Sequence, residues 1–191
     1  MVQNISGMEM LIIFDKTRII PSIVRYEQIS TAEKSQCQRV NLLVGTINNL
    51  HEIVGGLQES GKKVFVHIDM IGGIGKDSDA VSFFSKSVKV DGIITTKSSI
   101  VSAAKACGLL SVQRIFAIDT AALKTAIKTA KANQPDELEL MPGLMPKIIR
   151  QVKALIDKPL IVGGLISSER EVVQAFENKA DYVSIGNDKL W

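Results

Sequence analysis

The sequence has few of the side chains that build metal centres or disulfide frameworks. Its 191 residues include two cysteines and two histidines. Cys37 and Cys107 stand far apart in the chain, with no CxxC pattern and no companion histidines. This spacing argues against a zinc site or a disulfide framework. We therefore predict no metal ligands and two small, buried cysteine side chains.

Long hydrophobic runs are also missing. Every apolar stretch is far shorter than the roughly 18 residues that are needed to span a bilayer. The first residues, MVQNISGMEML, lack the basic region of a signal peptide. These absences predict a cytoplasmic protein that makes no membrane contact.

Charge of one sign is not abundant either. The chain has 23 basic and 20 acidic residues, and its net charge of +3 is too small to indicate a dedicated nucleic-acid domain. Basic side chains would therefore have to gather locally to bind a polyanion. With 46% hydrophobic and 23% charged residues, the composition is that of an ordinary globular protein. No linker or low-complexity segment divides it, so we predict a single domain over residues 1–191.

Short apolar runs alternate with amphipathic stretches along the chain. The runs predict eight strands, at residues 18–24, 39–45, 63–70, 92–96, 111–118, 137–141, 159–164 and 182–186. The stretches predict seven helices, at residues 26–37, 50–60, 79–89, 98–106, 120–132, 146–156 and 168–179. Eight such units predict an α/β fold, a small (β/α)8 TIM-type barrel of eight parallel strands whose last helix is missing or rudimentary. The alternative is a doubly wound open sheet, in which five or six strands would be expected.

Polar side chains follow the predicted strands at their carboxyl ends, where barrels of this kind carry their functional sites. His67 and Asp69 end the third strand and, being two residues apart, share one face of it. Further polar or glycine positions at strand ends are Asn48, Asn49, Thr95, Thr96, Lys97, Asp119, Thr120, Ser184, Gly186 and Asn187. We therefore predict a ligand site at this end of the barrel. The alternative for His67 is a hydrogen-bonded core residue, which is the more common role of a histidine in an apolar strand.

Glycines end the seventh predicted strand, and a small polar turn over residues 184–187 ends the eighth. Many barrels hold a phosphate at these two strand ends on backbone N–H groups. Because glycine lets the backbone approach an anion closely, Gly163 and Gly164 predict a phosphate site. The alternative is that the two glycines only make a tight turn.

The glycine-rich run at residues 72–76 does not fit a nucleotide-binding loop. Met70 stands where a P-loop needs glycine, and Asp77 stands where it needs Ser or Thr. Ser78 occupies the position at which a dinucleotide fingerprint needs glycine. We predict a flexible loop.

Two charged residues lie inside otherwise apolar strands, Arg114 in the fifth and Glu139 in the sixth. A lone buried charge is very costly, whereas a hydrogen-bonded pair is tolerable. Since consecutive strands of a barrel are neighbours, we predict that the two side chains pair inside it. The alternative is that the Arg114 guanidinium reaches a ligand phosphate, for which its geometry is well suited.

Basic residues outnumber acidic ones between residues 86 and 158. The basic residues that share a face on two consecutive predicted helices are Lys124, Lys128 and Lys131 on the first and Lys147, Arg150 and Lys153 on the second. Adjacent outer helices would place the two stripes side by side, which predicts an RNA-binding surface. A solvated lysine-rich face is the alternative.

The strings VFVHIDMI, DGIITTKSS, VQRIFAIDTAAL, LELMPGLMPKII and PLIVGGLI resemble the glycerol-3-phosphate-responsive antiterminator family. The resemblance covers residues 18–191 and is densest from Lys62 onward. Members of that family are cytoplasmic regulators with small (β/α)8 barrels. They bind glycerol 3-phosphate and act on the leader of glycerol-operon messenger RNA to prevent premature termination. The resemblance implies control of glycerol uptake and metabolism genes, with no catalytic residues and no cofactor beyond the effector.

Carried over by position, the resemblance completes the predicted ligand site. The positions that match the family's polar and glycine positions are His67, Asp69, Lys97, Arg114, Asp119, Glu139, Pro142, Gly143, Gly163, Gly164 and Ser184. All of these except Pro142, together with Gly186 and Asn187 at the end of the eighth strand, form the predicted ligand site. The sequence departs from the family pattern at Gly72, Ile185 and Gly186, where the family often has an acidic residue and two small hydroxyl residues. These departures bear on the affinity or identity of the effector.

Two further alternatives follow from the sequence. The barrel could instead be an enzyme that acts on a small phosphorylated three-carbon compound, with His67 or Asp69 as the base. Fold precedent alone supports this function.

At the end of the chain, the apolar Leu190 and Trp191 are expected either to cover the gap left by the missing helix or to seal a homodimer.

Overall fold

The structure, a computed structural model, describes residues 15–191 and confirms the predicted barrel. The strands are β1 (Ile19–Ile23), β2 (Arg39–Leu42), β3 (Lys63–His67), β4 (Gly92–Thr95), β5 (Leu110–Phe116), β6 (Glu137–Met141), β7 (Leu160–Gly163) and β8 (Tyr182–Ile185). The helices are α1 (Ile29–Lys34), α2 (Leu50–Glu59), α3 (Ser78–Phe83), α4 (Ser98–Ala106), α5 (Thr120–Asn133), α6 (Pro146–Leu155) and α7 (Glu169–Glu177). Residues 1–14 of the predicted domain lie outside the described residues.

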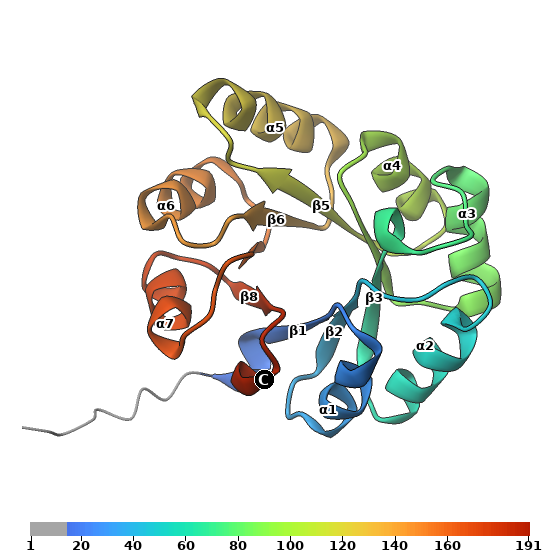
Figure 1. The fold of residues 1–191 in the computed structure, drawn as a ribbon. Coiled ribbons are helices and arrows are strands. Elements are labelled where there is room, and N and C mark those ends of the chain that lie inside the picture. Colours follow the sequence, from blue (N-terminus) through green and yellow to red (C-terminus); the bar gives the residue numbers. More distant parts are fainter. Residues whose placement is uncertain (1–14) are drawn as a thin grey trace, which may run out of the picture.

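The strands form one closed, all-parallel barrel in the order β1 to β8, surrounded by the helices (Figure 1). Closure comes from β1 pairing with β8, where Ile20 lies opposite Ser184. Because all strands are parallel, their carboxyl ends meet at one end of the barrel, called the mouth below. The open sheet considered as an alternative is excluded.

Local sequence explains most helix boundaries. Ser168 and Glu171 form the capping box that begins α7, and Pro146 occupies the first turn of α6. The stretch predicted at residues 79–89 is instead a short α-helix that continues into a π-helical turn, Phe84–Val88. After β8 the chain makes a 3₁₀ turn, Asp188–Leu190, in place of an eighth α-helix.

The residues after β8 cover the side of the barrel between α7 and α1. Leu190 is buried, and Trp191 packs against both outer hydrophobic clusters. The Trp191 indole Nε1 donates to the Ile185 carbonyl oxygen at 2.8 Å. This packing fits the first of the two roles expected for these residues, covering the gap.

The hydrophobic core has an outer and an inner part. Two large clusters fill the space between strands and helices, whereas the small inner cluster consists of Ile20, Phe65, Ile94, Val112 and Ile161. Cys37 is buried as predicted, but Cys107 is only partly buried. Within residues 15–191, no helix has the length and apolar character needed to cross a membrane.

Candidate functional site

A buried polar layer lies between the inner apolar cluster and the mouth. Phe65 and Val112 belong to the inner cluster, so His67 and Arg114, each two residues further along the same strand, also point into the barrel. The layer also contains Ser22 and Asn41 from β1 and β2, which pair with each other in register, and Glu139 and Ser184 from β6 and β8.

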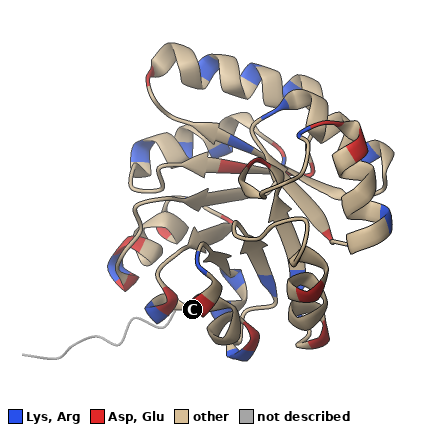
Figure 2. Ribbon diagram, turned by 45° about the vertical axis from the view of Figure 1, so that its right-hand side comes forward, with Lys and Arg blue, Asp and Glu red and all other residues tan. Residues whose placement is uncertain are grey.

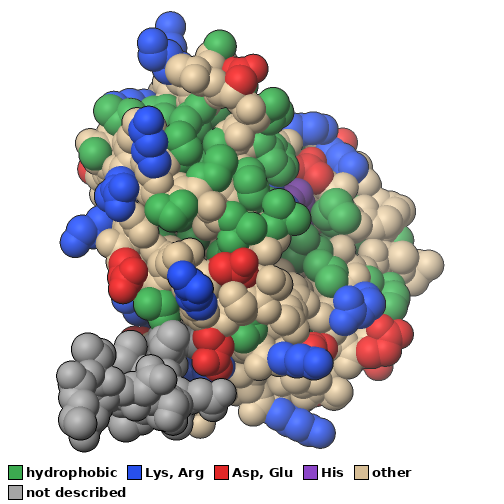
Figure 3. Space-filling view, turned by 60° about the vertical axis from the view of Figure 1, so that its left-hand side comes forward, with side chains coloured by type: hydrophobic (Ala, Val, Ile, Leu, Met, Phe, Trp, Pro, Cys, Tyr) green, Lys and Arg blue, Asp and Glu red, His purple; other side chains and the backbone are tan. Residues whose placement is uncertain are grey.

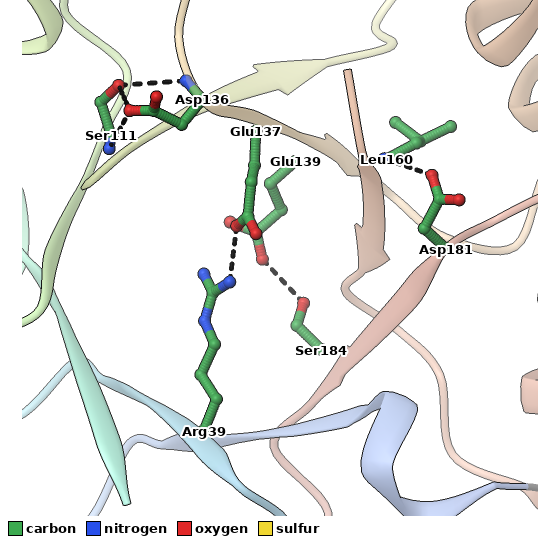
Figure 4. A network of polar contacts seen from close by, with 8 residues as sticks. All are labelled: Arg39, Ser111, Asp136, Glu137, Glu139, Leu160, Asp181 and Ser184. Atoms are coloured by element: carbon green, nitrogen blue, oxygen red, sulfur yellow. Dashed lines mark hydrogen bonds and ion pairs between the residues drawn. The ribbon is translucent and has the colours of Figure 1, made fainter. Parts of the chain in front are cut away.

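Arg114 and Glu139 form the ion pair that the sequence predicts. They face each other in the β5–β6 register, and Arg114 Nε donates to Glu139 Oε2 at 2.7 Å. The Ser184 hydroxyl donates to the other carboxylate oxygen, also at 2.7 Å (Figure 4). Glu139 is completely buried. Both of its oxygens are therefore satisfied, which is what makes a charge tolerable at this depth.

Four polar groups of the layer have no protein partner. They are Arg114 Nη2, His67 Nδ1 and both side-chain amide atoms of Asn41, all buried. Buried polar atoms are nearly always hydrogen-bonded, so a cluster of unpaired ones calls for an explanation. A cationic donor with one free N–H group, beside a neutral imidazole and an amide, is suited to binding a small anionic or hydroxylated ligand.

His67 and Asp69 do not form a dyad. β3 ends at His67, and Asp69 lies in a 3₁₀ turn, Ile68–Met70, so the prediction that they share one face of a strand is wrong. His67 Nδ1 is 3.8 Å from Asp69 Oδ2, too far for a hydrogen bond. The Asp69 carboxylate instead accepts from Thr95 Oγ1 and the Thr96 N–H. It thereby ties the end of β3 to the end of β4.

Burial of the His67 imidazole lowers its pKa from 6.5 to about 4, and the neighbouring Arg114 charge adds to this shift. The Asp69 and Glu139 carboxylates act in the opposite direction but do not compensate. Near neutral pH the ring is therefore uncharged, with one nitrogen available as an acceptor.

We expect the free energy of unfolding to fall as the pH drops from about 7 to 4.5. In the unfolded chain His67 takes up a proton near pH 6.5, whereas in the fold it stays neutral until about pH 4. The contribution of neutral His67 to stability is thus complete above pH 6.5. It is lost on acidification, so that the free energy of unfolding is lower by about 2–3 kcal/mol at pH 4.5. Urea unfolding at both pH values measures it. His67→Gln should make the free energy of unfolding depend less on pH between 7 and 4.5, whereas replacing the exposed His51 by Gln should leave that dependence as it is in the wild type. The same pH dependence in both variants would contradict His67 as its cause.

Three other predicted ligand residues lie on the exposed rim of the mouth or near it. Asp119 begins α5, where its carboxylate accepts from the Ala122 N–H at 2.7 Å. Lys97 is exposed at the start of α4, and Asn187 caps the 3₁₀ turn after β8. The hydrogen bonds of Asp119 and Asn187 explain them as helix or turn caps, whereas the Lys97 side chain makes no capping hydrogen bond. None of the three reaches the buried layer through a hydrogen bond given by the structure.

The glycines mark places where backbones approach closely. A Cβ atom on Gly163 would lie 2.0 Å from Ser184 Oγ, and one on Gly143 would lie 3.2 Å from the Gly163 nitrogen. Gly164 has a φ of +77°, which fits the tight turn considered as an alternative. Gly186 follows Ile185 at the end of β8, where a Cβ atom would meet only the Ser22 carbonyl oxygen, at 3.8 Å. The four glycines thus flank the polar layer at the mouth, and the phosphate site stays a prediction.

The two basic stripes do not form one continuous face. On α5, Lys124, Lys128 and Lys131 are exposed, and Figure 2 shows basic positions repeating along this helix. On α6 only Lys147 points to solvent without a partner given by the structure. Arg150 donates to Asn178 Oδ1 at the end of α7, and Lys153 pairs with Asp181 at 2.6 Å. Two of the three α6 members thus bond toward the end of α7 instead of standing free beside the α5 stripe, and the RNA-binding role of the six residues stays a prediction.

Sequence reasoning missed a second ion pair at the opposite end of the barrel. Arg39 of β2 and Glu137 of β6 meet across the interior at 2.5 Å (Figure 4), and the Arg39 guanidinium stacks on the Phe65 ring. Asn41 was missed as well. A polar side chain in the apolar run RVNLLVG was the available signal, the same one that identified Arg114.

Fold and site together define the class: a small (β/α)8 barrel with a buried polar layer under a glycine-lined mouth. The model of the glycerol-3-phosphate responsive antiterminator family matches residues 19–191. The chain therefore belongs to this family.

Individual proteins show the same relationship. The crystal structure of the glycerol uptake operon antiterminator regulatory protein from Listeria monocytogenes is 30% identical, with a TM-score of 0.89 over 93% of this chain and 96% of that one. A glycerol uptake operon antiterminator-related protein from Thermotoga maritima is also 30% identical, with a TM-score of 0.80 over 91% and 96%. The Escherichia coli protein YgcP is 30% identical over 96% of both chains.

Proposed function

We propose that this protein binds glycerol 3-phosphate at the barrel mouth and acts in the cytoplasm on leader messenger RNA, as a transcription antiterminator of glycerol uptake and metabolism genes. Membership of the family supports this function. The proposal assigns the protein a regulatory role without catalysis. The effector shifts the protein between two states that differ in RNA affinity, which requires that it bind one of them more tightly.

The observation that carries the effector site is the unpaired, buried Arg114 Nη2. Glu139 occupies Arg114 Nε, but the N–H groups of Nη2 stay unused. A phosphate oxygen would satisfy this group, and the glycines at the ends of β7 and β8 lie at the same end of the barrel. The unpaired Asn41 amide and His67 Nδ1 are the matching partners for the hydroxyl groups of the glycerol moiety.

The enzyme alternative receives less support from the geometry. A general base works best when a second group orients it. His67 has no hydrogen-bonded carboxylate within the described residues, and Asp69 is held by Thr95 and Thr96. The layer therefore resembles a recognition site more than an acid–base pair.

We expect calorimetric titration with glycerol 3-phosphate to show saturable binding, with at least tenfold weaker binding of glycerol and of inorganic phosphate. A tenfold difference corresponds to about 1.4 kcal/mol, which one lost charge-assisted hydrogen bond supplies. Asn41→Leu should weaken the binding, because it removes the amide without touching the Arg114–Glu139 pair. Equal affinities for all three compounds would contradict the proposed effector.

A further inference from the structure

Exposed apolar side chains gather at the mouth of the barrel. Within the described residues, the large hydrophobic side chains that are exposed on this side are Val24, Tyr26, Ile47, Met70, Phe116, Ile118, Leu144 and Leu165. We call them the mouth rim. The three highest exposures all belong to it, with Ile118 at 81%, Leu165 at 74% and Met70 at 56%. On the face shown in Figure 3, hydrophobic side chains form a broad area bordered by both basic and acidic ones. Apolar surface of this extent marks an interaction site.

The charges around the mouth rim are balanced. In the described connections from each strand to the next helix, and after β8, the basic residues are Arg25, Lys76, Lys97 and Lys189, and the acidic ones are Glu27, Asp69, Asp77, Asp119 and Asp188. Such a surface has no excess positive charge to attract a nucleic acid. It also does not repel a copy of itself, whereas the lysines of α5 would repel theirs.

The protein has no lid of its own in the described part of the chain. The connections that leave β4, β5, β6 and β7 are residues 96–97, 117–119, 142–145 and 164–168. They are shorter than loops that fold over an active site. The longer connection after β3 is tied down by the bridge between Thr46 and Gly72. The described chain offers no cover for the exposed mouth rim, so such a cover has to come from another molecule.

We propose that a second copy of this chain supplies the cover, in a two-fold dimer that joins mouth rim to mouth rim. An isologous contact presents the same patch from both subunits, so it needs a patch that is apolar and balanced in charge. The mouth rim meets both conditions. The dimer would close over the polar layer and would leave the lysines of α5 on its outside. The link between the dimer and glycerol 3-phosphate rests on the proposed function. If closure of the dimer excludes water from the bound effector, effector binding strengthens dimerisation, and dimerisation strengthens effector binding by the same factor.

Sedimentation equilibrium of the full chain tests the dimer without any ligand. The double variant Ile118→Asp/Leu165→Asp should weaken dimerisation about 100-fold, because it places like charges in an apolar contact. Both side chains are exposed, and Leu165 has a φ of +64°, which aspartate adopts more readily than leucine, so the fold should be retained. The matched control is Leu155→Asp, an exposed leucine at the end of α6 away from the mouth.

A wild-type protein that stays monomeric with and without effector would overturn the proposal. So would a dimer that the Leu155 variant disrupts or that the mouth variant leaves intact. Hydrogen exchange of the wild type gives a readout that needs no variant: amides at 117–119 and 164–168 should lose protection on dilution. If only the proposed binding of glycerol 3-phosphate is wrong, the dimer should still form and respond to the variants, while calorimetry shows no binding of glycerol 3-phosphate.

Discussion

Replacing Glu139 with leucine is expected to lower the free energy of unfolding by about 3–5 kcal/mol, the cost of leaving one member of a buried ion pair alone. Glu139 is completely buried and accepts from both Arg114 Nε and the Ser184 hydroxyl. The variant leaves the Arg114 charge without its anion and Ser184 without its acceptor. Urea denaturation monitored by circular dichroism measures the loss.

The double variant Arg114→Met/Glu139→Leu separates the cost of an unpaired charge from the cost of altered packing. Replacing both partners by apolar residues of similar volume is often close to neutral, so the double variant should recover most of the lost stability. It should nevertheless bind no glycerol 3-phosphate, because the Arg114 Nη2 donor is gone. Lys128→Ala, an exposed change on α5, serves as the control and should alter stability by no more than about 0.5 kcal/mol. A Glu139→Leu protein as stable as the wild type would show that the pair is not what anchors the layer.

Replacing Lys124, Lys128 and Lys131 together by alanine is expected to reduce the affinity for leader RNA about 100-fold at 0.1 M salt. Each contact to a single-stranded phosphate contributes about 0.7 to the slope of log affinity against log salt, so three contacts contribute about 2. The slope should become shallower by this amount, whichever RNA sequence is used. Filter binding or fluorescence anisotropy across a salt series measures both quantities.

The second basic stripe offers a control of equal charge. Lys147→Ala/Arg150→Ala/Lys153→Ala removes the same number of positive charges from α6. Because Arg150 and Lys153 already bond to Asn178 and Asp181, this variant should lose stability but should change the salt slope by less than half as much. An unchanged slope in the α5 variant would remove this helix from the RNA-binding surface.

Most of the fold follows from periodicity in the sequence. Eight apolar runs separated by seven amphipathic stretches predict eight parallel strands with helices between them, and short connections favour a closed barrel. Strand ends are less certain because apolar residues continue past them. Leu43 and Val44 follow β2 and Ile68 follows β3, yet each lies in a loop or turn. Ile68 is buried, and Leu43 and Val44 are partly buried. The apolar character of these residues predicts burial, but it does not show whether their backbone joins the ladder.

The site is predictable where burial of charge dictates the partner. Arg114 and Glu139 had to pair, because neighbouring strands place them together and neither charge is stable alone. Side-chain direction on an exposed helix has no such constraint. Arg150 and Lys153 turn toward α7 because Asn178 and Asp181 lie there, and that proximity depends on the three-dimensional packing of α6 and α7. The partners of Asp69 are not predictable from the sequence for the same reason, because they come from the end of β4.

The proposed function requires that glycerol 3-phosphate at the mouth change the affinity of the protein for RNA. Titration of labelled leader RNA at one fixed salt concentration, with and without saturating glycerol 3-phosphate, tests it most directly. A coupling of about 1–3 kcal/mol predicts a 5- to 150-fold difference between the two binding curves. The difference should disappear in the Arg114→Met/Glu139→Leu variant. Superimposable curves for the wild-type protein would contradict the proposed coupling between glycerol 3-phosphate and RNA.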